Sequence, residues 1–322
     1  MAYTLTTSSS SALLWSYFHR KMLDFVKPRL VFDQIGDKKP LPQKYGNSVI
    51  FTKFKKLTPI TASGTEGTPP TPLALTSAQI TTSVGQYKNA VGYTDALIAQ
   101  GSVEDMDSFI EEVVSENAGT SLDSVCRNAL EGAIGTTIFG GNAAALSDVD
   151  AADKLTLSLA RQAKVTLESN DVGPHSSGNY IFVGHPNTIY DMKTDTATGG
   201  WIDVFKYSDA GNKNLFNAEA GMVDDIKFLS STLVSKTNTG TSAGAYVYSN
   251  MIFGYQPFAS VKLDGYSLKL IHHKPGSSGV SDCTDELGTV AWKIWYAAKY
   301  LGGNATVADP ERAILVRTGR ST

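Results

Sequence analysis

Two strand-like segments enclose an interval that a compact domain cannot pack by itself. Residues 47–58 and 78–94 alternate apolar and polar side chains, a pattern that predicts β-strands. Between them, residues 59–77 hold four prolines and two glycines. A structureless connection of this length is uncommon inside a compact domain and is usually functional. We therefore expect a long hairpin over residues 46–94, and because a lone two-stranded ribbon is marginal in water, it requires a partner surface.

Composition excludes several classes of protein. The chain has 322 residues, 42% of them hydrophobic, which is enough for a sizeable core. Its net charge of −3 argues against a protein that attracts nucleic acid in bulk. No apolar run reaches the roughly 20 residues of a membrane-spanning helix, and no signal peptide is evident at the N-terminus. Two cysteines make neither a disulfide framework nor a four-ligand zinc site, which favours folding in a reducing cytoplasm.

The N-terminal stretch combines apolar and basic residues without a period. Between residues 12 and 45 it has seven basic against three acidic side chains, in a chain that is acidic overall. It also carries many large apolar groups that an irregular arm cannot bury alone. We expect it to lie against another surface. The residues of interest in this arm are Trp15, Arg20, Lys21, Lys27 and Arg29.

The clearest helix is predicted to begin near Ser102 and to run for about 28 residues, which is long for a globular protein. Its apolar positions step by three to five residues, so proline or a charge at Ile110 or Val113 is expected to damage the fold. Gly119 weakens its middle. A second helix is predicted over residues 150–168, with aspartates at its start where they complement the helix dipole.

Beyond residue 178, strands and loops alternate with one short helix at 187–195. The expected strands are 179–186, 224–232, 245–256, 266–274, 286–301 and 312–319. Helices and strands do not alternate as regular βαβ units, so the fold class is α+β.

Sequence patterns suggestive of catalysis have simpler explanations. Residues 240–244 match G-x-S-x-G around Ser242, but a hydrolase elbow needs a strand before it and a helix after it. Here a polar loop precedes it and a β-rich run follows. His272 and His273 with Cys283 suggest a metal corner, yet neighbouring strand residues point to opposite faces. No catalytic, cofactor-binding or metal-binding residue is assigned.

The ordered blocks resemble the tailed-phage major capsid proteins of the Hong Kong 97-type fold, and among them the phage N4-type family. The resemblance covers roughly residues 44–301. It rests on KYGNSV (44–49), FTKFKKLTP (51–59), TEG (65–67), LTSAQIT (75–81), VGHP (183–186), IKFLSST (226–232) and GTVAWKIWYAAKYL (288–301).

The resemblance implies a domain organisation. Residues 1–45 would be an N-arm and residues 46–94 an extended loop, the E-loop. Residues 95–149 would form a peripheral domain with a long spine helix. Residues 150–260 would form most of an axial domain, and residues 261–322 would supply strands that return to the peripheral and axial domains.

The resemblance also implies a function without catalysis or cofactor. Many copies would assemble into hexamers and pentamers of an icosahedral head around double-stranded DNA, in the cytoplasm of a bacterial host. Partners would be a separate scaffolding protein, a portal, decoration proteins and the packaged DNA, with no membrane. The E-loop residues expected at the interface between subunits are Phe51, Phe54, Glu66, Pro69, Pro70 and Leu73.

Some alternatives stay open at this point. The chain could be another virion protein, such as a tail or decoration component, or a serine hydrolase using Ser242. The basic N-arm could face DNA phosphates or pair with acidic groups on a neighbouring spine helix. Lys53, Lys55 and Lys56 on the hairpin are interpreted as ordinary protection of an exposed strand edge.

Overall fold

The computed structural model describes residues 31–67, 69–100, 106–195, 201, 219–238, 245–277 and 282–321. The chain forms two compact units, each assembled from three separated stretches. The first unit takes Met1–Asn47, Ser83–Asn128 and Ser260–Ala298. The second takes Ser48–Thr82, Ala129–Ala259 and Lys299–Thr322. Within the described ranges, no helix is long and apolar enough to cross a membrane.

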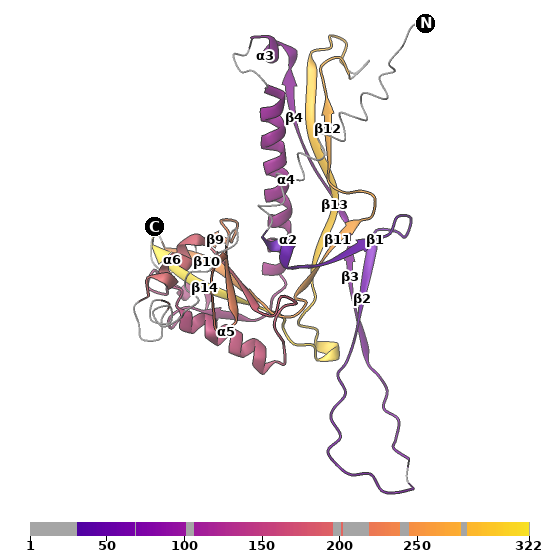
Figure 1. The fold of residues 1–322 in the computed structure, drawn as a ribbon, viewed down its shortest axis with the longest axis vertical. Helices are drawn as coiled ribbons and strands as arrows, with labels where there is room; N and C mark the ends of the chain where they lie inside the picture. The colour runs from indigo at the N-terminus through magenta and orange to yellow at the C-terminus, as the bar shows by residue number, and fades with distance from the viewer. Residues whose placement is uncertain are drawn as a thin grey trace. The chain divides into compact units, whose positions relative to one another are not determined.

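The first unit is built on a five-stranded sheet with a long helix beside it (Figure 1). The sheet order is β1-β11-β13-β12, and β4 also pairs with β13. The strands are β1 (Asp37–Leu41), β4 (Gly85–Thr94), β11 (Phe258–Leu263), β12 (Lys269–His273) and β13 (Leu287–Tyr300). The helices are α2 (Phe32–Ile35), α3 (Asp95–Gln100) and α4 (Met106–Glu131).

The 26-residue helix α4 buries one stripe of side chains at every fourth position. Val114, Ala118, Leu122, Cys126 and Leu130 are all buried. This spacing places them on one face of the helix. The predicted long helix is confirmed, while its predicted start near Ser102 lies outside the described residues.

Strand β13 alternates strictly between buried and half-buried positions over most of its 14 residues. Trp292 and Tyr296 share the buried face, and Trp295 lies on the other. The predicted strand 286–301 is confirmed. Successive side chains of a strand point to opposite faces of the sheet, so the apolar residues at every second position of β13 lie on its buried face.

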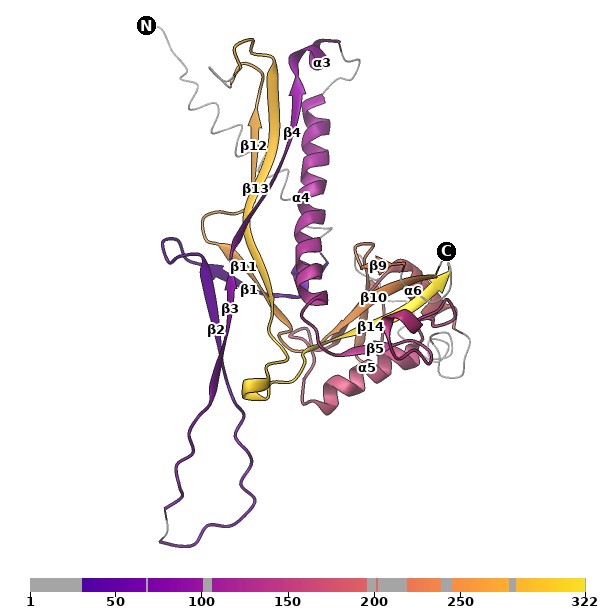
Figure 2. The ribbon, with the colours of Figure 1, turned by 180° about the vertical axis from the view of Figure 1, so that it is seen from behind.

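The second unit contains a seven-stranded sheet, with α5 (Leu157–Ser169) along it (Figure 2). Its order is β5-β14-β10-β6-β8-β7, with β9 paired to β10. The strands are β5 (Thr137–Phe139), β6 (Tyr180–Gly184), β7 (Glu219–Val223), β8 (Ile226–Ser230), β9 (Lys236–Thr237), β10 (Ala245–Phe253) and β14 (Ala313–Ser321). Short 3-10 turns are η2 (Leu146–Asp148) and η4 (Ala305–Val307).

The VGHP motif forms the link from β6 to α6 (Pro186–Lys193). The His185 ring accepts a hydrogen bond from Asn187 N at 3.2 Å, so it caps the helix. The buried amide of Asn250 accepts from His185 N and Thr188 Oγ1 at 3.1 and 2.9 Å. A Cβ at Gly184 would lie 3.1–3.3 Å from three neighbours, which favours glycine there. The motif therefore encodes a close helix–strand junction.

A two-stranded ribbon, β2 (Ser48–Phe54) with β3 (Ser77–Ser83), completes the second unit. The predicted return strand 78–94 is wrong in one respect, because it is two strands separated at Val84. The second, β4, pairs with β13 from Thr94↔Leu287 to Gly85↔Tyr296. A partner about two hundred residues away in the chain leaves no local signal.

Two further expectations are corrected. Helix α5 begins at Leu157, where Thr156 Oγ1 accepts from Leu159 N at 3.3 Å, so aspartates do not occupy its first turn. Asp150 and Asp153 instead close a turn, with Asp153 Oδ2 accepting from Asp150 N at 2.9 Å. Val113 is 47% exposed, so its expected role in packing is also wrong.

Ile110 and Val113 provide a matched test of α4 packing. Ile110→Asp should lower the free energy of unfolding by about 3 kcal/mol, because it places a charge at a position that is only 9% exposed. Val113→Asp should change it by about 0.5 kcal/mol or less. Urea unfolding measures both. Equal losses for the two variants would contradict the assigned orientation of α4.

Candidate functional site

The ribbon β2–β3 exposes large apolar side chains along its length and around its connecting segment. Leu73 is 67% exposed and Ile60 is 80% exposed. Other members of this exposed apolar set are Ile50, Phe54, Leu57 and Leu75. Such a concentration on a two-stranded element is unusual for a surface that faces only water. The ribbon is therefore the first candidate for contact with another chain.

The predicted hairpin interface residues can now be placed. Phe54, Glu66, Pro69, Pro70 and Leu73 are exposed, and Phe51 is half-buried. Sequence reasoning missed Ile60 and Leu75, whose neighbours in the Pro-rich interval gave no period. The N-arm residues Trp15, Arg20, Lys21, Lys27 and Arg29 lie outside the described residues, as does Ser242.

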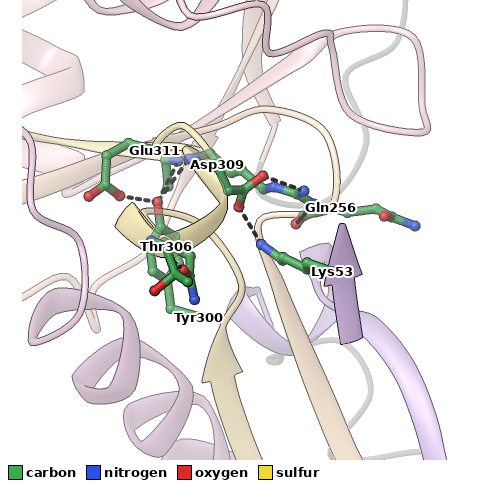
Figure 3. Close-up of polar contacts among 9 residues, drawn as sticks. Lys53, Gln256, Tyr300, Thr306, Asp309 and Glu311 are labelled. Carbon is green, nitrogen blue, oxygen red and sulfur yellow. Dashed lines mark hydrogen bonds and ion pairs between the residues drawn. The ribbon is translucent and has the colours of Figure 1, made fainter. Parts of the chain in front are cut away.

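An ion-pair cluster anchors the ribbon within the second unit (Figure 3). Lys53 Nζ on β2 contacts Asp309 Oδ2, and the two side chains are only 12% and 13% exposed. Asp309 Oδ1 also accepts from Arg312 at 3.0 Å, and Arg312 donates to the Gln256 carbonyl at 3.3 Å. Burial lowers the pKa of Lys53, while the hydrogen bond to Asp309 opposes that shift. The interpretation of Lys53 as ordinary edge protection is therefore wrong.

The loop that carries Asp309 is itself held by Tyr300, the last residue of β13. The Tyr300 hydroxyl donates to Glu311 and accepts from the backbone N–H groups of Arg312 and Ala313 at 2.9 and 3.2 Å (Figure 3). Burial, with Glu311, raises the pKa of Tyr300. A Cβ at Gly302 would lie 2.4 Å from the Tyr300 hydroxyl, so the loop requires glycine there. Tyr300 thus holds the loop that presents Asp309 to Lys53.

A groove of about 590 Å³ opens beside this anchor. Its walls include Phe54 and Lys56 of the ribbon, Val172 after α5, and Tyr255. Lys56 reaches Asp171 at 3.1 Å, with both side chains exposed. An exposed pair of this kind adds little to stability. Two attachments of the ribbon therefore lie at the groove: the largely buried Lys53–Asp309 pair, which is strong, and the exposed Lys56–Asp171 pair, which is weak.

The first unit holds a second polar cluster, where α4 meets the sheet. The Tyr296 hydroxyl donates to Asp33 Oδ1 at 2.6 Å and lies 2.6 Å from Cys126 Sγ. Lys262 Nζ lies 3.2 Å from Asp33 Oδ2. Burial raises the pKa of the Cys126 thiol to about 12, so this cysteine stays protonated. The cluster ties α2, α4, β11 and β13 together.

Asp123 on α4 binds the start of α2. Its Oδ1 accepts from the backbone N–H groups of Phe32 and Asp33 at 2.8 and 3.4 Å. Burial raises the pKa of Asp123 to about 6, against the opposing effect of those hydrogen bonds. The carboxyl thus fixes the point at which the N-terminal stretch meets α4.

The suggested metal corner does not form in the described part of the chain. His272 Nε2 lies 2.8 Å from the Tyr93 hydroxyl and its Nδ1 lies 3.4 Å from Glu111 Oε1, whereas His273 is exposed. Among the described residues, no group of three or more His, Cys, Asp or Glu side chains could hold a metal ion. Glu111 on α4 is itself buried.

Sequence comparisons find no relative. No family model matches the chain, and no curated protein matches it.

Solved structures do match. A chain of the capsid of Ralstonia phage GP4 aligns with a TM-score of 0.71 and 14% identity, covering 92% of both chains. A chain of the cyanophage Pam1 capsid gives a TM-score of 0.61 and 16% identity, covering 87% of this chain and 86% of its own. One from the capsid of cyanophage P-SCSP1u gives 0.57 and 15%, covering 91% and 89%.

The chain has the fold of tailed-phage capsid subunits. The expected α+β class of the Hong Kong 97 type is confirmed by these likenesses, which span almost the whole chain.

The anchor predicts a clear difference between two ribbon lysines. Lys53→Ala should lower the free energy of unfolding by about 1–3 kcal/mol, because Asp309 loses a largely buried partner. Lys56→Ala should cost about 0.5 kcal/mol or less, since its pair with Asp171 is exposed. Denaturant unfolding, with Asp309→Ala in a double-mutant cycle, measures the coupling. A coupling energy near zero would refute the anchor.

Asp123 predicts a pH dependence of stability. Its pKa of about 6 in the folded chain lies above the usual carboxyl value of 3.8, so folding favours the protonated carboxyl. Its stabilisation is therefore complete below about pH 4 and is lost as pH rises through 6, by about 3 kcal/mol in total. The difference in unfolding free energy between wild type and Asp123→Asn should fall by this order between pH 4 and 7. A difference that is flat or rises with pH would contradict the assignment.

Proposed function

We propose that this chain is the major capsid subunit of a tailed phage, with copies assembling into hexamers and pentamers of an icosahedral head around double-stranded DNA. The observation that carries the proposal is the likeness over 92% of both chains to a chain of the GP4 capsid. The exposed apolar ribbon agrees with it. Contacts between unlike patches of identical copies generate rings, which is the geometry of a capsomer.

In this function, the parts of the chain take the roles that the resemblance implied. Residues 1–45 serve as the N-arm, 46–94 as the E-loop, 95–149 as the peripheral domain with the spine helix, and 150–260 as most of the axial domain. Residues 261–322 supply strands that return to the peripheral and axial domains. The boundaries of the two compact units do not coincide with these stretches, because 46–94, 95–149 and 261–322 are each divided between the units. The E-loop contacts a neighbouring copy through the side chains already named: Phe51, Phe54, Glu66, Pro69, Pro70 and Leu73.

The remaining proposals concern partners and kinship. A separate scaffolding protein, a portal and decoration proteins would complete the head, and assembly would take place in the cytoplasm of a bacterial host. Weak contacts to packaged DNA agree with the net charge of −3. Kinship with the N4-type capsid family remains part of this proposal. The role is structural rather than enzymatic.

The test begins with self-assembly of the purified full chain. Negative-stain electron microscopy beside analytical sedimentation should reveal closed shells, tubes or six-membered rings. If the chain stays monomeric alone, the same measurement on particles from infected cells decides the matter. There a major capsid protein must be the most abundant chain, and its scarcity would refute the proposal.

Deleting residues 60–76 should separate folding from assembly. The deletion removes the exposed connecting segment of the ribbon but not the Lys53–Asp309 anchor, so the thermal unfolding temperature should stay within a few degrees of wild type. Shell yield should fall by about ten-fold or more, because the lost apolar side chains lie on the proposed interface.

A point-charge pair sharpens that prediction. Leu73→Glu on the ribbon should reduce shell yield, whereas Val165→Glu on α5, at a comparably exposed apolar position, should not. Normal shells from both the deletion and Leu73→Glu would remove the ribbon from the interface.

A further inference from the structure

The connecting segment of the ribbon contains a proline pattern that favours one backbone conformation. Pro69, Pro70 and Pro72 lie in the stretch 69–76, which belongs to no helix or strand. Proline fixes its own φ near −65° and drives the preceding residue to extended backbone, so this stretch favours polyproline II. That helix repeats every three residues. Pro69 and Pro72 therefore share one face, and Pro70 and Leu73 share the next.

Both of these faces are apolar and exposed. Glu66 is the only charged residue between positions 57 and 87, so the segment itself is uncharged. Proteins bind polyproline II helices with P-x-x-P spacing in grooves lined by aromatic side chains, because a preformed helix loses little entropy on binding. The spacing of Pro69 and Pro72 is of this kind. The segment thus has the features of a ligand for such a groove.

The groove beside the Lys53–Asp309 anchor has a complementary lining. Phe54 and Tyr255 both line it and are both exposed, and Pro310 adds a third apolar ring. Its volume of about 590 Å³ lies within the roughly 300–1,000 Å³ of ligand-binding pockets. Aromatic side chains that stay exposed around a hollow indicate a site of interaction.

The charges at the groove are balanced within the subunit. The charged lining residues are two cations, Lys56 and Arg312, and two anions, Asp171 and Asp309. Lys56 already contacts Asp171, and Arg312 already contacts Asp309. A charged occupant would have to break one of these pairs or bury its own charge unpaired, whereas an uncharged occupant does neither. The neutral groove therefore matches the neutral proline segment.

The ribbon directs its own proline segment away from its own groove. Lys55 N–H donates to the Thr76 carbonyl at 2.9 Å, so the two chains of the ribbon are still paired one residue beyond Phe54. From Thr76 the connecting segment continues away from the ends of β2 and β3 (Figure 1). Four residues of polyproline II carry Pro72 about 12 Å farther. The occupant that fits is therefore the same segment of a second copy.

We propose that residues 69–73 of one copy bind as a polyproline II helix in this groove of a neighbouring copy, whose Phe54 and Tyr255 contact the P-x-x-P face. The inference rests on the proposed function, since it names the site that receives the ribbon in the next subunit. Lys53 anchors β2 one residue before Phe54. The contact that directs each ribbon thus also positions a wall of the site that receives the next ribbon. Because the segment and the groove are different surfaces, these contacts run head to tail around a ring.

A peptide tests the groove without assembly. A fluorescently labelled peptide of residues 66–76 should bind saturably to the dilute, unassembled full chain, as measured by fluorescence anisotropy. Tyr255→Ala should weaken binding about ten-fold, because it removes an aromatic ring from the groove. Tyr190→Ala removes an exposed tyrosine elsewhere on the second unit and should leave binding unchanged. An absence of saturable binding, or equal losses for the two variants, would overturn the proposal.

The sequence of the peptide tests the bound conformation. A peptide with Thr71→Pro and Pro72→Thr keeps its composition but moves one proline off the shared face, so binding should weaken about ten-fold. A peptide with Thr71→Ala changes only the third face and should bind within about two-fold of the native peptide. If the exchanged peptide binds as tightly as the native one, the segment does not dock as a polyproline II helix.

Mixed assembly tests whether the occupant is a second copy. Two variants in a Cys283→Ser background, one with Leu73→Cys and the other with Tyr255→Cys, are assembled together and oxidised with diamide. They should form disulfide-linked mixed dimers, which non-reducing electrophoresis detects, whereas Leu73→Cys with Tyr190→Cys should not. Shells that lack the mixed dimer would refute the docking site and leave the proposed function standing. If the peptide binds its groove but shells never form, the docking site stands and the proposed function fails.

Discussion

The structure depends on the fact that a two-stranded ribbon has no interior. Strands β2 and β3 pair only with each other in the described sheets, so neither face can be covered by further strands. Its direction must then come from a contact of another kind, and the second unit supplies it with Lys53 and Asp309. A largely buried ion pair is directional in a way that apolar contact is not, since leaving either charge unpaired costs about 1–3 kcal/mol. The ribbon is thus positioned at one end while its apolar side chains stay exposed.

In the first unit, the position of α4 against the sheet is fixed by buried polar groups that form hydrogen bonds with one another. Tyr296 uses its only proton on Asp33, so the Cys126 thiol can donate to the phenol oxygen, and Lys262 neutralises the carboxylate. Trp292 Nε1 donates to Asn117 Oδ1 at 3.0 Å, and Asn89 donates to the same oxygen at 3.0 Å. Each of these hydrogen bonds joins α4 to the sheet at one position along the helix axis. Apolar packing alone would allow the helix to slide along its axis, whereas these bonds fix its register.

The elements that could be predicted from sequence are those in which buried side chains recur at a regular spacing along the chain. Helix α4 and strand β13 bury one face over many residues, so spacing alone located both. Val113 shows the limit, because helical spacing gives the width of an apolar stripe but not which of its edges faces solvent. The return strand failed for a different reason. Residues 85–94 have the composition of a ribbon strand, and only the presence of β13 decides that they pair elsewhere.

The candidate site was half predictable for the same physical reason. Prolines and glycines mark the ribbon's connecting segment locally, so its existence could be predicted from the sequence, while its need for a partner surface stays a prediction. The anchor did not, because Lys53 and Asp309 lie 256 residues apart and neither has a local signature. In the proposed shell, the ion-pair anchor and the exposed apolar side chains have different roles. Directional ion pairs within each subunit hold the ribbon's geometry, while apolar area between subunits supplies adhesion that is weak per copy and strong in sum. A subunit built the other way, with weak internal anchors and strong mutual adhesion, would bind its neighbours before its ribbon had a defined direction.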